Sequence, residues 1–147
     1  MTRIVHVETD AVRVPVARAR VQRVADAVLR AEGVRHAEVS ITFVSDRAMA
    51  RLNWRHLHHR GPTDVISFGF APASTAGGIA GDVYIAPAVA RRNALAHGAG
   101  MREELLRLVV HGVLHVVGHE HPIDDTRTAS PMWKRQERLL ARAMADA

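Results

Sequence analysis

The chain has 147 residues, 48% of them hydrophobic, and this size and composition predict a single domain over residues 1–147 with a core of its own. No apolar run approaches the roughly 18 residues that cross a bilayer, and the first residues lack the pattern of a secretory signal. We therefore expect a cytoplasmic protein without membrane contact. The absence of cysteine excludes disulfides and thiolate nucleophiles, so a transition metal would need imidazole or carboxylate ligands.

The charge balance is basic, with 20 Lys and Arg residues against 15 Asp and Glu residues and a formal net charge of +5. Lys134 is the only lysine. Guanidinium groups bind phosphate through paired hydrogen bonds, so the arginine excess predicts a polyanionic partner. Seven of the 10 histidines lie in two clusters, at residues 56–59 and 111–121.

In chain order, the first half is predicted to alternate strands and helices. Alternating apolar residues predict a strand over residues 3–8, and Pro15 suits the first turn of a helix that runs to about residue 32. A second strand is predicted over residues 37–44. Ser45 is a suitable N-cap for a helix from residue 46 to about 56.

The second half is predicted to add a hairpin and then helices. Residues 64–70 and 81–86 are two strands joined by a loop rich in small residues, which predicts a hairpin. Helical spacing then predicts three helices, over residues 87–97, 102–118 and 131–144. The order of elements predicts the α+β class, as a single domain with a four-stranded mixed β-sheet packed by about five helices.

The helix over residues 102–118 is apolar on nearly every side and is therefore expected to be buried. His111 and His115 are four residues apart, so their rings lie on one face of this helix. Burying two imidazoles is costly unless each has a partner, and a shared metal ion satisfies both. These residues are candidate metal ligands.

Gly118 is placed to end the helix and return His121 towards the same point. Three histidine ligands with a fourth position for water are typical of catalytic zinc sites. His119 is an alternative ligand if the helix continues through Gly118, but glycine disfavours a helix interior, so we prefer His121.

The same histidine spacing occurs in the metzincin proteases, whose segment HExxHxxGxxH carries a glutamate general base after the first histidine. Gly112 occupies that position here. A metallohydrolase for peptides or small phosphoesters therefore remains only a disfavoured alternative.

The segment HGVLHVVGHEH at residues 111–121 resembles the HGxLHLxGYDH signature of the YbeY family, bacterial rRNA maturation factors described as metal-dependent endoribonucleases. Further segments resemble the family in order: Leu52-Asn53, PTDVISF at 62–68, GDVYI at 81–85, and Met132, Gln136, Glu137 and Leu140 in the last helix. The chain is identified as a member of this family over nearly its whole length. The resemblance implies one YbeY-like metal-dependent hydrolase domain over residues 1–147.

The resemblance implies a single-strand-specific, metal-dependent endoribonuclease involved in late-stage 70S ribosome quality control and in maturation of the 3′ end of 16S rRNA. The implied partners are ribosomal RNA and the ribosome or its small-subunit proteins. The implied cofactor is one Zn²⁺ ion per chain on His111, His115 and His121, although such sites also accept other divalent transition metals. The alternative is a ribosome-assembly factor that binds RNA and has a largely structural metal.

The expected catalytic residues are His111, His115, Asp64, Arg55 and Arg60. Asp64 and Asp82 begin two strands, where each carboxylate either orients a ligand histidine or caps its strand. The family has an arginine between LN and PTDV that is associated with RNA cleavage, and Leu57 stands there in this chain. Arg55 and Arg60 flank Leu57 and are its candidate replacements. With 4% aromatic residues, we expect contacts to RNA backbone and shape rather than base stacking.

Overall fold

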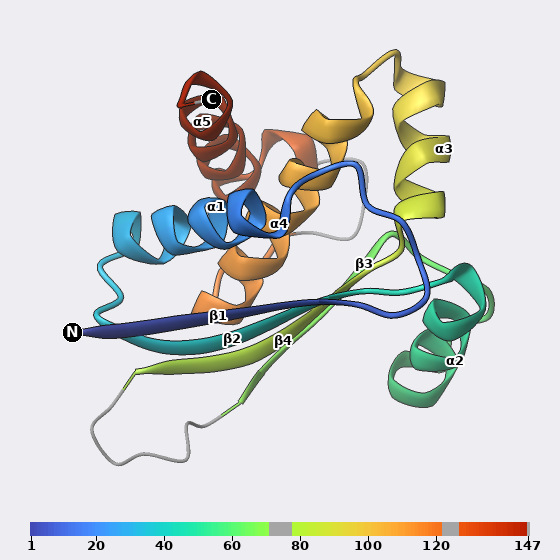
Figure 1. Ribbon diagram of the computed structural model, residues 1–147, viewed down its shortest axis with the longest axis horizontal. Coiled ribbons are helices and arrows are strands. Elements are labelled where there is room, and N and C mark those ends of the chain that lie inside the picture. Colours follow the sequence, from blue (N-terminus) through green and yellow to red (C-terminus); the bar gives the residue numbers. More distant parts are fainter. Residues whose placement is uncertain (71–77, 122–126, 147) are drawn as a thin grey trace.

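The computed structural model describes residues 1–70, 78–121 and 127–146, and its centre is a mixed four-stranded sheet in the order β1-β2-β4-β3 (Figure 1). The strands are β1 (Thr2–Thr9), β2 (His36–Phe43), β3 (Val65–Phe70) and β4 (Ile79–Ile85). β1, β2 and β4 are parallel, and β3 is antiparallel to β4. The predicted hairpin and the mixed sheet are therefore confirmed. Most of the loop expected between β3 and β4 lies outside the described residues.

Five α-helices and one short 3-10 helix accompany the sheet in the described ranges: α1 (Arg18–Ala31), α2 (Asp46–Leu57), α3 (Pro87–His97), α4 (Met101–Val117), η1 (Arg127–Ala129) and α5 (Pro131–Ala145). The predicted start of α1 at Pro15 is wrong. Ala17 is still extended, with φ −62° and ψ 141°, so the helix begins at Arg18. The Pro15 carbonyl instead accepts a hydrogen bond of 3.1 Å from Arg102 Nε. None of these helices has the length and apolarity to cross a bilayer.

Helix α4 is the central helix, and it packs against α1, α3, α5, β3 and β4 (Figure 1). Alternate residues of the strands face it, including the fully buried Val39, Ile41 and Val83. Helix α2 covers part of the opposite face, where Met49 and Ile66 belong to a separate small core. The burial predicted for the helix around residues 102–118 is thus confirmed, and its two histidines, in its second half, are partly buried.

Gly112 lets α4 lie directly on β4. A Cβ atom at this position would lie 2.5 Å from Val83 Cγ1, which is far inside van der Waals contact. Residue 112 therefore faces the sheet and has no room for a side chain. A glutamate general base of the metzincin type is incompatible with this packing. The close contact with Val83 therefore explains why this chain has glycine where the metzincins have glutamate.

Candidate metal centre

Three histidines from the end of α4 and the segment after it meet at one point. The ring centroids of His111 and His115 are 4.6 Å apart, and the His121 ring lies 5.1 Å from His111 and 4.9 Å from His115. One ligand nitrogen of each residue lies within 4.8 Å of the others. All three side chains are partly buried. Three imidazoles at this separation can share one metal ion, and the set leaves a fourth coordination position.

Gly118 produces the turn that brings His121 to the other two histidines. Its φ of 120° is in the left-handed region, and its N–H donates to the carbonyls of His115 and Leu114 at 3.0 and 3.1 Å. The N–H of His119 also donates to the Leu114 carbonyl, at 2.9 Å, which completes a glycine-based helix end. The expectation that the helix stops here is confirmed.

His119 lies outside the cluster of three histidines and pairs with Glu32, the residue that follows α1. Its Nε2 pairs with the Glu32 carboxylate, which also accepts 2.9 Å hydrogen bonds from Arg135. Burial raises the pKa of Glu32, but the hydrogen bonds from His119 and Arg135 lower it, and the pKa ends below its ordinary value. The structure therefore does not support the alternative in which His119 is a metal ligand.

Gln136 on α5 fixes the orientation of the His111 ring. Its side-chain oxygen lies 2.6 Å from His111 Nδ1, and Gln136 is only 1% exposed. The Gln136 amide nitrogen donates to Glu137 at 3.0 Å, so its oxygen is turned towards the imidazole. His111 Nδ1 therefore carries the proton, and Nε2 is the nitrogen suited to a metal.

The protonation state of His115 also suits a metal ligand. Burial, together with the neighbouring His111 and His121, lowers the pKa of His115 to about 4. The imidazole is consequently neutral near pH 7, which is the form that coordinates metals. The donor set and its supporting bonds thus fit a divalent transition metal ion such as zinc.

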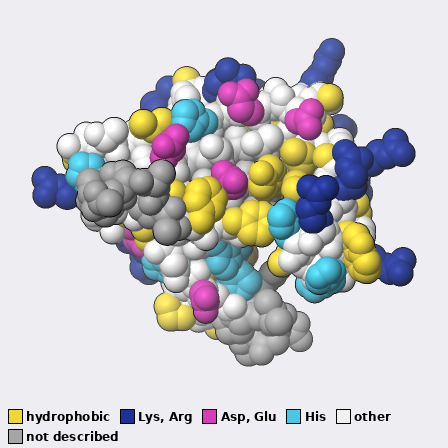
Figure 2. All heavy atoms as spheres, turned by 90° about the horizontal axis from the view of Figure 1, so that it is seen from below, with side chains coloured by type: hydrophobic (Ala, Val, Ile, Leu, Met, Phe, Trp, Pro, Cys, Tyr) yellow, Lys and Arg dark blue, Asp and Glu magenta, His cyan; other side chains and the backbone are white. Residues whose placement is uncertain are grey.

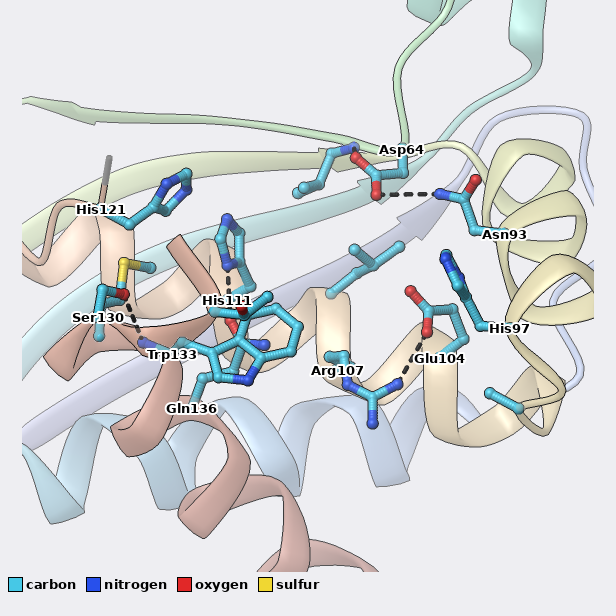
Figure 3. A pocket seen from close by; sticks show the side chains of 15 residues that line it. Asp64, Asn93, His97, Glu104, Arg107, His111, His121, Ser130, Trp133 and Gln136 are labelled. Atoms are coloured by element: carbon cyan, nitrogen blue, oxygen red, sulfur yellow. Dashed lines mark hydrogen bonds and ion pairs between the residues drawn. The ribbon is translucent and has the colours of Figure 1, made fainter. Parts of the chain in front are cut away.

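Two of the three histidines, His111 and His121, line a cavity of about 450 Å³, seen in Figure 3. His111 and His121 line one end of it, while Asp64, Asn93, His97 and Glu104 line the other. The Asp64 carboxylate accepts a 2.8 Å hydrogen bond from the Val65 N–H and a 3.3 Å hydrogen bond from the Asn93 amide. Asp64 is thus a cavity residue held in a fixed position.

Arg107 is the only lysine or arginine that lines this cavity in the described part of the chain. Its guanidinium pairs with Glu104 at 2.8 Å, Glu137 at 3.0 Å and Glu103 at 3.4 Å. The hydrogen bonds that Arg107 donates to Glu137 raise the pKa of Arg107, although burial opposes this rise. Its charge is therefore neutralised by carboxylates of the protein.

The remaining expected residues lie elsewhere. Arg55 and Arg60 are exposed near the end of α2 and are not among the residues that line the cavity, and Arg60 lies 5.6 Å above the Trp54 ring. Figure 2 shows basic side chains projecting where α2 lies. Asp82 lies in β4 between two residues that face α4, so its side chain is on the opposite face of the sheet. Trp133 and Asn93 also line the cavity, and Gln136 is the partner of His111. None of these three roles was predicted from the sequence.

The fold and the site define an α+β protein with a cluster of three histidines at the end of its central helix that could hold a metal ion. The sequence profile described as Endoribonuclease YbeY matches residues 5–144. The chain belongs to the YbeY family.

Individual relatives agree with this family. The chain is 39% identical over 136 residues to Endoribonuclease YbeY of Thermobifida fusca, covering 87% of this chain and 86% of that protein. It is also 39% identical to Endoribonuclease YbeY of Frankia alni, covering 71% of this chain and 62% of the longer relative. The solution structure of TM1509 from Thermotoga maritima shares the fold, with a TM-score of 0.65 at 20% identity over 97% of this chain and 91% of that one.

Proposed function

We propose that this protein is a metal-dependent endoribonuclease that cleaves single-stranded RNA. The observation that carries the proposal is the cluster of His111, His115 and His121 at the end of an open cavity. The family supports it, because the relatives are called endoribonucleases. The net charge of +5 suits a polyanionic substrate.

The proposed mechanism assigns separate tasks to the residues of the cavity. His111, His115 and His121 would hold one Zn²⁺ ion per chain. Such an ion would supply Lewis acidity and would lower the pKa of water to about 7. Gln136 keeps His111 in the tautomer that presents Nε2. Asp64, fixed by Val65 and Asn93 at the far end of the same cavity, is proposed to position the RNA by accepting hydrogen bonds from it.

Arg55 and Arg60 are assigned to substrate binding rather than to the cavity. Both are exposed near the end of α2, and Arg47 and Arg51, which come earlier in the same helix, are exposed as well. Guanidinium groups on such a surface bind RNA phosphates and raise affinity without reading sequence. We propose that they take the place of the family arginine, which Leu57 replaces at the last position of α2.

The proposed substrate is ribosomal RNA, with maturation of the 3′ end of 16S rRNA and late-stage 70S ribosome quality control as the processes served. The proposed partners are the ribosome or small-subunit proteins, in the cytoplasm. These assignments come from the family. We also propose that residues 1–147 act as one hydrolase domain.

The test uses a single-stranded RNA that contains the 3′ end of precursor 16S rRNA, with protein that carries one equivalent of zinc. We expect internal cleavage by the wild type and none by His115→Ala, while His6→Ala, an exposed histidine paired with Glu38, keeps full activity. Absence of cleavage by zinc-loaded wild type, or cleavage that survives in His115→Ala, would disprove the proposal.

A second candidate function is an RNA-binding ribosome-assembly factor whose metal is largely structural. It is favoured by Leu57 at the position of the family arginine and by the neutralisation of Arg107, the only lysine or arginine among the described residues that line the cavity. Zinc-loaded protein that binds the same RNA without cutting it would decide for this function.

A further inference from the structure

The cavity extends well beyond the three histidines. Its volume of about 450 Å³ lies in the range of about 300 to 1,000 Å³ that is usual for small-molecule sites. Figure 3 shows His121 and His111 towards one end and Asn93, His97 and Glu104 towards the other. A ligand bound at the histidines therefore has room to place a second group in the far part of the cavity.

One wall of the cavity is apolar and includes an aromatic ring. Trp133 is the third residue of α5 and lines the cavity with Leu108 and Met132. Its backbone N–H donates to Ser130 Oγ at 3.2 Å, which holds the first turn of the helix from which the indole projects. A half-buried indole beside a cavity is a surface on which a planar ring can stack, and base stacking contributes about 1 to 3 kcal/mol per base.

The far end of the cavity does not suit a phosphate. Glu104, whose side chain is 12% exposed, and Asp64 bring carboxylates to this end, and Arg107 is already paired with three glutamates. A phosphate placed here would face carboxylates without an available cation. A neutral group that donates hydrogen bonds is favoured instead, because carboxylate and amide oxygens accept them.

We infer that this cavity binds the nucleobase next to the cleaved phosphate, with Trp133 stacking on it and Glu104 and Asn93 reading its edge. The inference rests on the proposed function, since it takes the ligand to be RNA. An exocyclic amino group donates to carboxylate and amide oxygens, whereas uracil presents carbonyl oxygens at its corresponding positions. The cavity therefore prefers cytosine or adenine over uracil.

Nucleotide binding tests the inference without cleavage. Trp54→Phe removes the exposed indole on α2, so that Trp133 is the only tryptophan and reports on the cavity by fluorescence. We expect cytidine 5′-monophosphate to change this fluorescence saturably and to bind about tenfold more tightly than uridine 5′-monophosphate. Ribose 5-phosphate, which has no base, is expected to leave the fluorescence unchanged.

Calorimetry on cavity variants completes the test. Trp133→Leu is expected to weaken the binding of cytidine 5′-monophosphate by about tenfold. Asn93→Ala is expected to reduce the preference for cytidine 5′-monophosphate over uridine 5′-monophosphate. Trp54→Leu, the matched loss of an indole outside the cavity, is expected to bind like the wild type. Each variant is first compared with the wild type in Tm and zinc content. If Trp133→Leu fails to fold, the result for Asn93→Ala decides the test.

The outcomes separate the inference from the proposed function. RNA cleavage together with equal binding of the two nucleotides and ribose 5-phosphate overturns the base site and leaves the nuclease intact. Selective binding of cytidine 5′-monophosphate without RNA cleavage overturns the nuclease and supports the base site. Unchanged nucleotide binding in both Trp133→Leu and Asn93→Ala also overturns the inference.

Discussion

Gln136 Oε1 and His111 Nδ1 lie 2.6 Å apart, although the two residues belong to different helices. The bond joins α5 to the second half of α4 and leaves Nε2 as the nitrogen available to the proposed metal ion. It continues through Glu137 to Arg107, so the ligand is supported by a chain of polar contacts rather than by a single neighbour.

Replacing Gln136 with leucine is expected to weaken zinc binding by about 10-fold to 100-fold, because the His111 ring loses its orienting partner. Competition with a chromophoric chelator measures the affinity. Gln22→Leu is the matched control, since Gln22 donates a 3.2 Å hydrogen bond to the Val5 carbonyl on β1 rather than to a candidate ligand. Equal zinc affinity of the wild type and Gln136→Leu would refute the positioning role.

Zinc is expected to stabilise the folded protein, because it binds the assembled histidines and not the unfolded chain. At a free zinc concentration of 100 times Kd, the free energy of unfolding should rise by about 2.7 kcal/mol. Chemical denaturation with and without zinc measures this gain. His115→Ala should show a much smaller gain, and a gain equal to that of the wild type would place the metal elsewhere.

Gly112→Ala is expected to lower the free energy of unfolding by about 1 to 3 kcal/mol, because the new methyl group overlaps Val83. The better helix propensity of alanine offsets part of this loss. The double variant Gly112→Ala with Val83→Ala should show a favourable coupling, since the second change makes room for the first. Additive effects in urea denaturation would contradict the close contact of α4 and β4.

Glu32 is expected to make the free energy of unfolding depend on pH in the acid range. Its pKa in the folded protein is below the ordinary value of 4.5, so the charged carboxylate stabilises the fold above that pH. The contribution is lost as the pH falls through the lowered pKa. Glu32→Gln should therefore be less stable than the wild type at pH 7, with a difference that shrinks below pH 4.5. Exposed Glu8→Gln serves as the control, and a pH-independent difference would refute the assignment.

Arg55→Ala is expected to weaken binding of single-stranded RNA and to reduce the slope of log affinity against log salt by about 0.7, the value for one lost phosphate contact. Zinc content should be unchanged, since Arg55 is exposed and not among the residues that line the cavity. Arg55→Lys keeps the charge and should retain most of the slope. An unchanged slope in Arg55→Ala would exclude this residue from the RNA surface.

The sequence predicted the elements, the mixed sheet and the convergence of the three histidines, because each leaves a local pattern. Residues 111–121 contain the histidines and the glycine that turns the chain, so their convergence follows from helix geometry. Gln136 and Trp133 come from a helix whose packing on α4 has no local signature. Arg55 was expected at the site because its segment carries family motifs, but contact with the cavity depends on how α2 sits against the sheet.

The neutralisation of Arg107 separates the strength of RNA binding from the choice of base. Exposed arginines lie along α2, and their attraction for phosphate is screened by salt. Inside the cavity, the one guanidinium is paired with carboxylates of the protein, so no net cation there responds to ionic strength. Raising the salt concentration should therefore reduce how much RNA is bound while leaving the order of preference among bases unchanged.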